Sequence, residues 1–348
     1  MIKAVVLAGG QGKRLWPKST SDLPKQFITL FHGKSLFQYT IERLLTFLKI
    51  EDIYVVTLEK YREIVKDQVS IISDGNIIVE PCGRDTAACI GLSAVYLKHK
   101  YVDPILITIP ADQYVLQSEK YRDALNEAAN QASQEDCVVT LGIKPHRPET
   151  GYGYIKRGEK LGSFYKVEQF IEKPPLNLAK EYFNTPAYFW NSGIFVWRAS
   201  TVLQMIEQYM PLLSHGLKRI EKSFNTPEEK EIIEREYNII EKKSIDYGVI
   251  EQTDHIYVIP VDFIWDDLGS WDALERIFSS DEKGNVIEGE SLLMDTTNCV
   301  IHSSGQFIAT IGIKDLVIVA TEKAILVCPK NRAQEVKLLL EQNDLELG

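Results

Sequence analysis

Short apolar runs alternate with helical segments along the first 143 residues, and this alternation limits the possible folds more than any other feature. The apolar runs predict strands at residues 2–7, 53–57, 77–80, 105–109 and 137–143. Apolar residues recur at helical spacing in the segments 35–48, 60–72, 85–100 and 119–133, which predicts four helices. Strands that alternate with helices favour parallel βαβ units. We therefore predict an α/β fold with a Rossmann-like sheet, mixed but mainly parallel, that is flanked by helices.

The pattern loosens after Pro145 and changes again near residue 281. Between these points we expect strands at 151–155, 167–171, 188–197 and 256–260, and helices at 178–182, 200–209 and 227–237. The stretch 265–271 is expected to open a further short helix. A charged, glycine-containing stretch at 281–289 is followed by short β runs at 291–294, 299–302, 307–311, 316–320 and 324–328, which turns separate. A helix is expected at 332–341. The sequence thus predicts a first domain over 1–280 and a small β-rich, β-helix-like domain over 281–348.

Composition excludes several classes of protein. The chain has 348 residues, a hydrophobic fraction of 45% and a charged fraction of 25%, which is ordinary for a globular protein. Its net charge of −10 argues against a nucleic-acid partner. No segment is long enough to span a membrane, and the apolar stretch before Gly9 is too short for a signal peptide. The five cysteines lack zinc-ligand spacing, and we expect thiols in a reducing, cytoplasmic compartment.

The first strand runs directly into a glycine-rich turn. Gly9, Gly10 and Gly12 follow it, and Arg14 and Lys25 add positive charge nearby. Glycines let a backbone approach a phosphate closely, and such turns bind phosphates in α/β proteins. A Rossmann fingerprint would need a third glycine where Leu15 stands, and a P-loop would need one at Ile28. Both common motifs therefore fail, which leaves a different nucleotide site or a purely structural turn.

The exact string of this turn resembles a known signature. Together with residues 15–17 and 24–27, it is similar to the signature of the mannose-1-phosphate guanylyltransferases, within the sugar-1-phosphate nucleotidyltransferases. Seven further matches occur in order, at 80–87, 110–112, 149–155, 172–174, 190–193, 244–247 and 265–271. Two positions depart from the family pattern, because Gln113 stands where His is usual and Asp85 where Asn is usual. Asp85 loses an amide donor there, and we interpret it as a helix N-cap.

The resemblance implies a reaction and its requirements. An oxygen of α-D-mannose 1-phosphate would attack the α-phosphorus of GTP, giving GDP-mannose for polysaccharide biosynthesis and releasing pyrophosphate. Both reactants are anions, so Mg²⁺ and fixed cations must neutralise charge and hold them in line. No covalent nucleophile is needed, and the sequence offers no Ser/His/Asp or Cys/His arrangement. We expect a cytoplasmic homodimer with a single activity, because no room remains for the phosphomannose isomerase domain that some relatives carry.

The resemblance also implies roles for particular residues. Asp112 and Asp267 would hold the metal, although chemistry alone leaves the adjacent Asp266 open. Arg14 and Lys25 would bind the triphosphate and act in catalysis with the two aspartates. The nucleotide-binding set is Leu7, Ala8, Gly9, Gly10, Gly12, Lys13, Arg14, Lys25, Pro81, Gly83, Asp85, Thr86 and Asp112. The sugar-phosphate-binding set is Gly153, Glu172, Lys173, Asn191 and Ser192.

Several of these residues also have a plainer explanation. Asp112 and Asp267 could be solvated aspartates at strand ends, Lys173 a surface lysine, and Asn191–Gly193 an ordinary turn. Two other functions stay open, namely a sugar-1-phosphate nucleotidyltransferase that uses UTP, dTTP or another sugar, and a non-catalytic nucleotide-sugar sensor. The retained cations and carboxylates argue against the sensor. A nicotinamide oxidoreductase is excluded by the missing third glycine.

Overall fold

The computed structural model describes residues 1–10, 12–31 and 33–342 of the chain. The chain divides into two compact units. The sheet unit comprises Met1–Gly9, Ile41–Ala111 and Val115–Ile264. The β-rich unit comprises Gly10–Thr40, Asp112–Tyr114 and Trp265–Gly348. The glycine-rich turn therefore begins in the sheet unit and continues in the β-rich unit, and the predicted domain boundary at residue 280 stays a prediction.

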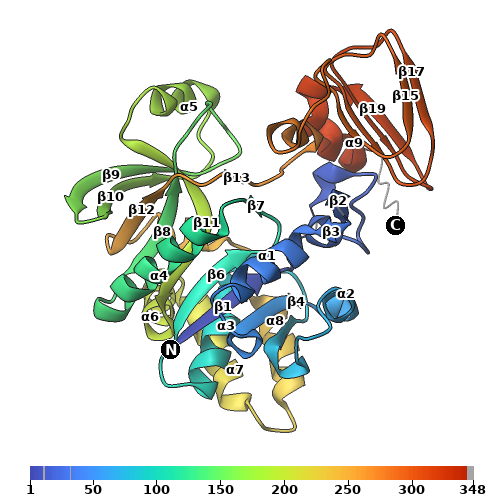
Figure 1. Cartoon of the computed structure of the whole chain (residues 1–348). Helices are drawn as coiled ribbons and strands as arrows, with labels where there is room; N and C mark the ends of the chain where they lie inside the picture. Colours follow the sequence, from blue (N-terminus) through green and yellow to red (C-terminus); the bar gives the residue numbers. More distant parts are fainter. Residues whose placement is uncertain (11, 32, 343–348) are drawn as a thin grey trace. The chain divides into compact units, whose positions relative to one another are not determined.

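The sheet unit is built on a nine-stranded mixed sheet (Figure 1). Its strands, in spatial order, are β5 (Ile77–Glu80), β4 (Ile53–Leu58), β1 (Ile2–Leu7), β6 (Ile105–Pro110), β11 (Tyr188–Arg198), β8 (Val138–Ile143), β12 (Ile256–Val261), β10 (Phe164–Ile171) and β9 (Tyr154–Leu161). The four strands from β5 to β6 are mutually parallel, as are β8 and β12. β11 runs antiparallel to both of its neighbours β6 and β8. The predicted mixed α/β fold is confirmed.

Helices cover this sheet. They are α1 (Leu36–Leu45), α2 (Arg62–Gln68), α3 (Asp85–Lys100), α4 (Ser118–Gln134), α5 (Leu176–Phe183), α6 (Ala199–Tyr209), α7 (Pro211–Ser223) and α8 (Glu229–Ile239). α3 is buried around most of its circumference and shares a core cluster with α6 and α7. A Cβ on Gly91 of α3 would lie 2.6 Å from a Leu217 methyl on α7, so a larger residue there would force the Leu217 side chain to shift.

Helix ends differ in how far the sequence predicted them. Ser35, the first residue of the helix predicted at 35–48, directly precedes α1: its hydroxyl accepts the Gln38 N–H at 3.1 Å, and the Gln38 side chain accepts the Ser35 N–H at 2.9 Å. This reciprocal pair is a capping box. α7 was not predicted, because Ser214, His215 and Gly216 interrupt its apolar pattern. The stretch 265–271, expected to open a short helix, forms the strand β13 (Trp265–Asp266) and a turn, and the 3₁₀ helix η7 (Trp271–Arg276) begins at its last residue.

The β-rich unit contains a coil of parallel strands. They are β14 (Val286–Glu288), β15 (Ser291–Met294), β16 (Val300–Ser303), β17 (Ile308–Ile311) and β18 (Leu316–Ala320), with β19 (Ile325–Pro329) antiparallel to β18 and followed by α9 (Val336–Gln342). Val286, Val300 and Val317 are aligned on three successive strands of one sheet, and β15 pairs in parallel with β17. This stacking of successive turns confirms the β-helix-like prediction.

Alternate residues of the coil face two different apolar clusters, as strand geometry requires. Val300, Val317 and Val319 belong to a cluster with Leu15 and Trp271. Ile301, Ile318 and Ala320 belong to a separate cluster within the coil. The strands β2 (Thr29–Phe31) and β3 (Lys34–Ser35) also belong to this unit. None of the helices formed by the described residues is long and apolar enough to cross a membrane.

Candidate active site

Two predicted nucleotide-binding segments begin at the ends of parallel strands in the sheet unit. Leu7–Gly9 lies at the end of β1, and Pro81–Gly83 follows β5. Because β1 and β5 run parallel, both segments lie at one edge of the sheet, where α/β proteins bind ligands. The Ala8 N–H donates to Val56 O at 2.8 Å and the Ala8 carbonyl accepts the Thr57 hydroxyl at 3.0 Å. The backbone of Ala8 is thus firmly held within the sheet.

A buried carboxyl group lies behind this edge. Glu80 ends β5 with 3% exposure, and the Tyr237 hydroxyl donates to its Oε1 at 3.2 Å. A Cβ on Gly9 would lie 3.4 Å from Glu80 Oε2, so Glu80 reaches the start of the glycine turn. Burial raises the pKa of Glu80 to about 7, although hydrogen bonds from Cys89 and Tyr237 oppose the rise. Sequence reasoning missed this group, because burial depends on the fold.

In the β-rich unit the glycine-rich turn is folded closely against Lys25. Gly12 has a φ of +58°, and a Cβ there would lie 2.2 Å from the Lys25 Cβ. Gly12 is therefore required both by the left-handed backbone and by the close approach. Its carbonyl accepts the Ser19 hydroxyl at 2.8 Å, and the Gly10 carbonyl accepts the Gln26 amide at 2.9 Å. Lys13 and Arg14 are exposed on the 3₁₀ helix η1 (Lys13–Leu15).

Lys25 joins the two predicted metal-binding residues. Its side chain is almost fully buried, at 7% exposure, and its Nζ lies 2.8 Å from Asp112 Oδ2. The same ammonium donates to the main-chain carbonyl of Asp267. Asp112 follows β6 and Asp267 follows β13, so 155 positions of sequence separate two residues that contact one cation. The structure therefore brings together three of the four predicted catalytic residues.

The structure also separates the roles of two adjacent aspartates. Asp266 is 3% exposed, and its two carboxylate oxygens accept Arg276 at 2.7 and 3.0 Å. Asp266 also accepts the Leu268 N–H at 2.8 Å, while Asp267 accepts the Gly269 N–H at 3.0 Å. Leu268, which follows the two aspartates, is buried with a φ of +49°, which is a strained conformation for leucine. The bidentate ion pair commits Asp266 to the fold and favours Asp267 as the metal ligand.

The two departures from the family pattern have structural roles. Gln113 is buried, and its side-chain oxygen accepts the Trp265 indole N–H at 3.0 Å. Asp85 does not cap α3 in the usual way, because the N-cap position is Arg84 and no side chain makes a capping hydrogen bond. Asp85 instead adopts a φ of +67° and accepts the N–H of Thr86 at 2.8 Å. The N-cap interpretation of Asp85 is therefore wrong, and the Thr86 hydroxyl accepts the Ile245 N–H at 2.9 Å.

Three residues predicted to bind the sugar phosphate lie together in the sheet unit. A Cβ on Gly153 would lie 2.5 Å from Glu172 Oε2 and 3.3 Å from the Asn191 Cβ. Asn191 donates from its amide to Asp246 at 3.0 Å. Burial, with the nearby Glu172 carboxylate, raises the pKa of Asp246 to about 7. Asp246 lies within the motif at 244–247, but the sequence assigned it no role, because its position beside Glu172 cannot be seen in the sequence.

Ser192 differs from these residues. Its side chain is buried at 1% exposure, and its hydroxyl accepts the N–H of Ile194 at 3.2 Å. The β11 ladder is irregular between Asn191 and Phe195, so the turn that the sequence indicated is accommodated inside a strand. A contact between Ser192 and a sugar stays a prediction.

Lys173 opens onto a charged cavity. Its backbone has a φ of +47°, which is disfavoured for a residue that precedes proline. Burial opposes the charge on Lys173, but the Glu172 carboxylate at 2.5 Å outweighs it and raises the lysine pKa. A cavity of about 510 Å³ is lined by Lys173, Asp85, Lys242, Lys243 and Tyr247, among others. Sequence reasoning missed Lys242 and Lys243, although both directly precede the motif at 244–247.

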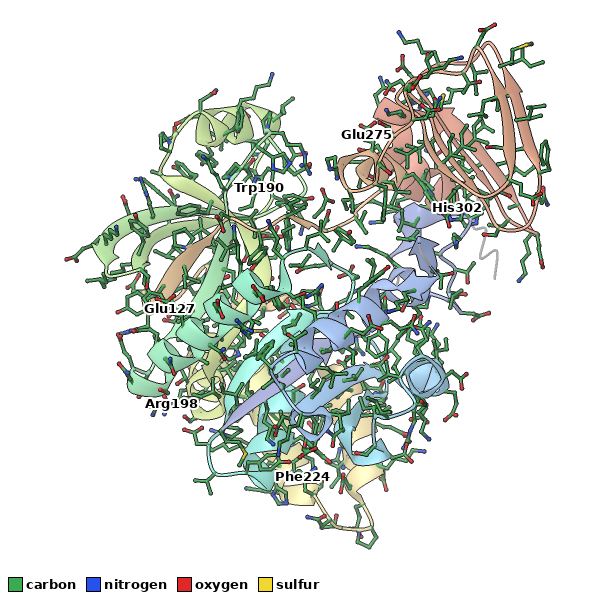
Figure 2. The ribbon with its side chains drawn as sticks, viewed as in Figure 1. Glu127, Trp190, Arg198, Phe224, Glu275 and His302 are labelled. Atoms are coloured by element: carbon green, nitrogen blue, oxygen red, sulfur yellow. The ribbon has the colours of Figure 1, made fainter. Side chains whose placement is uncertain are left out.

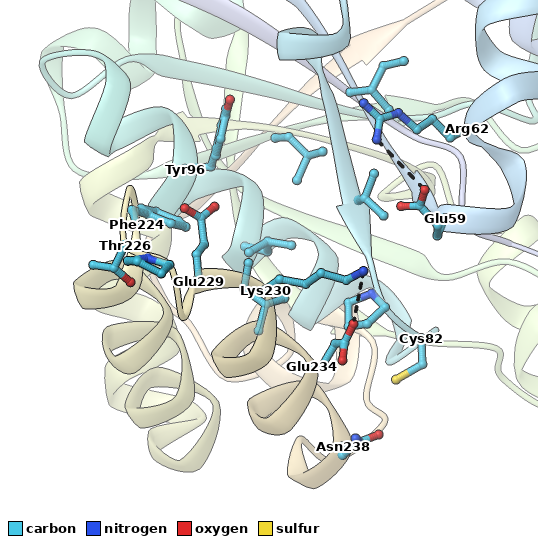
Figure 3. Close-up of a pocket in the computed structure, with 17 residues that line it drawn as sticks. Glu59, Arg62, Cys82, Tyr96, Phe224, Thr226, Glu229, Lys230, Glu234 and Asn238 are labelled. Carbon is cyan, nitrogen blue, oxygen red and sulfur yellow. Dashed lines mark ion pairs between the residues drawn. The ribbon is translucent and has the colours of Figure 1, made fainter.

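A second cavity is distinct from these residues. It has a volume of about 870 Å³ and lies beside β5, α3 and α8 (Figure 3). Ion pairs of 4.0 Å join Glu59 to Arg62 and Lys230 to Glu234 on its walls. Pro81 is the one predicted site residue among those that line it. Its mixed apolar and ion-paired lining does not indicate a phosphate site.

The donor set suits a hard divalent cation. Within residues 1–10, 12–31 and 33–342, no cluster of three or more His, Cys, Asp and Glu side chains could hold a metal. Mg²⁺ commonly takes only one or two carboxylates and completes its coordination with water and substrate phosphates. Asp112, whose side chain is 39% exposed, and Asp267 supply such a pair. The residues therefore fit a metal that arrives with a nucleotide.

Comparison with known proteins gives consistent results. The family model described as nucleotidyl transferase matches residues 3–284, and the model described as MannoseP isomerase/GMP-like beta-helix domain matches residues 289–342. A mannose-1-phosphate guanylyltransferase of Klebsiella pneumoniae is 37% identical, over 98% of this chain and 74% of that protein. The alginate biosynthesis protein AlgA of Pseudomonas aeruginosa is 34% identical, over 98% and 72%.

A solved structure is similar over the whole chain. It is a Thermus thermophilus protein described as a mannose-1-phosphate geranyltransferase, with 36% identity and a TM-score of 0.89. The match covers 99% of each chain. The similarity therefore extends over both the sheet and the β-rich region.

Proposed function

The chain belongs to the nucleotidyl transferase family, and we propose that it transfers GMP from GTP to α-D-mannose 1-phosphate, giving GDP-mannose and pyrophosphate. The relatives that carry this activity in their names are 35–38% identical over nearly the whole chain. One observation in the structure supports the proposal most directly: the Lys25 ammonium contacts both Asp112 and Asp267. The ammonium donates to the Asp112 carboxylate and to the main-chain carbonyl of Asp267. A fixed cation thus lies beside the two residues that would hold the metal, where a triphosphate needs both charges.

We assign the phosphate chemistry to the β-rich unit. Lys25 is held in place by Gly12 and the aspartates, so it presents a fixed positive charge to the triphosphate. Arg14 is exposed on η1 and would neutralise charge on the departing pyrophosphate. Asp112 and Asp267 would hold Mg²⁺, which supplies charge neutralisation at the phosphate oxygens. Because these groups act by position and charge, the transfer needs no covalent intermediate.

We assign recognition of the sugar phosphate to the sheet unit. Lys173, Lys242 and Lys243 line one cavity and would attract the phosphate of mannose 1-phosphate. Glu172 and Asn191 offer acceptors and donors suited to sugar hydroxyls. Gly153 leaves the space that Glu172 occupies. The positive backbone φ at Lys173 supports a functional role, because strain of this kind concentrates at ligand sites.

A pyrophosphate-release panel tests the proposal. Purified protein is supplied with Mg²⁺ and with each pairing of GTP, UTP, dTTP and ATP with mannose, glucose and heptose 1-phosphates. We expect the highest rate with GTP and mannose 1-phosphate, and loss of the rate on addition of EDTA. Higher activity with UTP or dTTP would overturn the guanylyl assignment. Tight nucleotide binding without pyrophosphate release from any pair would instead support a sensor.

The compartment and the assembly of the protein belong to the same proposal. We propose that the protein acts in the cytoplasm, where nucleoside triphosphates are available. We also propose a homodimer, which light scattering of the purified chain at several concentrations would check. A mass equal to one chain, 39.6 kDa, at all concentrations would contradict the dimer.

A further inference from the structure

A lysine beside the glycine-rich turn contacts a histidine of the coil. Lys18 follows the signature residues Trp16 and Pro17, and its Nζ lies 2.9 Å from Nε2 of His302. His302, labelled in Figure 2, is on β16 and is only 1% exposed. An ammonium group can donate but cannot accept a hydrogen bond. His302 must therefore be neutral at Nε2 and accept from Lys18.

The electrostatic surroundings agree with this assignment. Burial lowers the pKa of His302 to about 4, and the Lys18 charge contributes to that shift. Burial also lowers the pKa of Lys18 to about 8, against the nearby Glu288 carboxylate, which raises it. At pH 7 the pair is thus an ammonium donor and a neutral imidazole acceptor. A partly buried lysine that keeps its proton is stabilised by such a partner.

Other contacts fix the same stretch of chain. The Trp271 indole N–H donates to the Trp16 carbonyl at 2.9 Å, and the Trp271 ring lies 5.4 Å from that of His302. Leu15 is fully buried in the cluster that includes Val300 and Val319. Ser19, directly after Lys18, donates to the Gly12 carbonyl. The coil and η7 therefore hold both sides of Pro17, and Ser19 links that anchor to the turn that contacts Lys25.

We propose that His302 is a positioning residue for the nucleotide loop: by accepting the Lys18 ammonium, it holds the segment 13–25 so that Arg14 and Lys25 meet the triphosphate. This inference rests on the proposed function for the identity of the ligand, but not for the contact itself. It gives the β-rich coil a role in the reaction that neither the signature nor the family models assign to it. It also explains why the Lys18 ammonium is partly buried at this position.

Two measurements test the proposal on His302→Ala, His302→Gln and a control. Gln can place its side-chain oxygen near the position of Nε2, so it preserves the acceptor. The control is Thr310→Val, which removes another buried polar contact of the coil, the 2.7 Å pair of Thr310 with Thr296. The first measurement is the rate of trypsin cleavage after Lys13 and Arg14, identified by mass spectrometry. The second is steady-state kinetics with GTP and mannose 1-phosphate varied separately.

We expect His302→Ala to accelerate cleavage at Lys13 and Arg14 and to raise the KM for GTP, each about 10-fold, because a hydrogen bond to a charged group is lost. The KM for mannose 1-phosphate should change less than about twofold, because the lost contact does not involve the residues assigned to the sugar phosphate. His302→Gln should restore both values toward those of the unmodified protein. Thr310→Val should lower the melting temperature without either effect.

A double-mutant cycle assigns the effect to the pair. Lys18→Met keeps the length of the side chain but removes the ammonium group, and the Lys18→Met/His302→Ala double variant should be no worse than the poorer single variant. Three results would each overturn the proposal: additive effects of the two substitutions, failure of His302→Gln to restore the cleavage rate and the KM for GTP, or a Thr310→Val variant that changes both values as much as His302→Ala does. If the unmodified protein releases no pyrophosphate from GTP, the proposed function fails, and the trypsin measurement still decides the role of His302.

Discussion

Two neighbouring aspartates show how different the tasks of adjacent residues can be. Asp266 is buried in a bidentate ion pair with Arg276. Asp267 contacts the Lys25 ammonium through its main-chain carbonyl, and its carboxylate accepts the Gly269 N–H. Asp267→Asn keeps the shape and the Gly269 contact but removes the carboxylate that we propose as a metal ligand. We expect kcat to fall by about 100-fold or more, with the melting temperature nearly unchanged.

Asp266→Asn is the matched control for that variant. It removes the buried, bidentate partner of Arg276 and leaves only Asp272, at 3.3 Å, to pair with the guanidinium, which costs about 3 kcal/mol of folding free energy. We expect a lower melting temperature and, at temperatures where the protein is folded, a kcat within a few-fold of the starting value. The reverse pattern, with turnover lost in Asp266→Asn and kept in Asp267→Asn, would transfer the metal role to Asp266.

Gly153 gives a second prediction at the level of one residue. A Cβ at this position would lie 2.5 Å from Glu172 Oε2, and the flexible end of that side chain would have to move. Gly153→Ala should therefore raise the KM for mannose 1-phosphate by about 10-fold while leaving the KM for GTP unchanged. Gly75→Ala, whose Cβ would meet nothing within 4 Å, is the control. Equal effects on both KM values would contradict the assignment of Gly153 to the sugar.

Single residues also show what the sequence could and could not predict. Gly12 and Lys25 were predicted from the signature, and Asp112 and Asp267 from the motifs that follow it in the same order as in the family. The structure brings the last three residues together. Asp246 and Lys243 were missed as site residues. Their significance depends on burial beside Glu172 or on a shared cavity, and both are produced by packing between segments far apart in the chain.

At the level of elements, the end of β5 predicts a dependence of stability on pH. The folded pKa of Glu80, about 7, exceeds the ordinary glutamate value of 4.5. Between these values the folded state binds more protons than the unfolded state, so stability falls as the pH rises. The charged form above pH 7 is penalised by at most about 3 kcal/mol.

Glu80→Gln removes this penalty and keeps an acceptor for the Tyr237 hydroxyl. The variant should match the unmodified protein near pH 4.5 and exceed it in melting temperature by a growing margin up to pH 8. Thermal unfolding followed at pH 5, 6, 7 and 8 checks the trend. A difference that stays constant with pH would show that Glu80 is not held at a raised pKa.

Elements with strong local patterns were predicted well. The strands β1 and β5 and the helix α1 follow from apolar runs and apolar periodicity, and α1 begins one residue after the predicted start at Ser35. α7 was missed, since Ser214, His215 and Gly216 interrupt its apolar pattern, and the sequence does not show that Gly216 lies against Glu236 of α8. The start of α3 was misjudged because Asp85 adopts a left-handed conformation, which overrides the usual preference of aspartate for the N-cap.

At the level of the whole chain, a segment near the N-terminus shares its core with the C-terminal coil. Residues 10–40 group with the strands after 265 in the β-rich unit, and Leu15 lies in one cluster with Val317 and Val319. The sequence predicted the coil from its short β runs. It did not predict this shared core, because periodicity reports which face of a strand is apolar but not which distant segment covers it.

Substitutions at two neighbouring residues of β18 can test whether the coil supports the nucleotide loop or only stabilises its own fold. Val319 belongs to the cluster with Leu15, whereas Ile318 faces the other cluster. Val319→Ala should leave a cavity in the core beneath the loop and raise the KM for GTP about threefold or more, with little change for mannose 1-phosphate.

Ile318→Ala should cost more folding free energy, about 3 kcal/mol, yet leave both KM values unchanged below the melting temperature. Kinetics at about 25 °C alongside thermal unfolding distinguishes the two variants. If the KM for GTP followed the loss of stability regardless of which face of β18 was altered, the coil would act only as a stabilising domain. If it followed the face, the coil would be part of the machinery that holds the triphosphate.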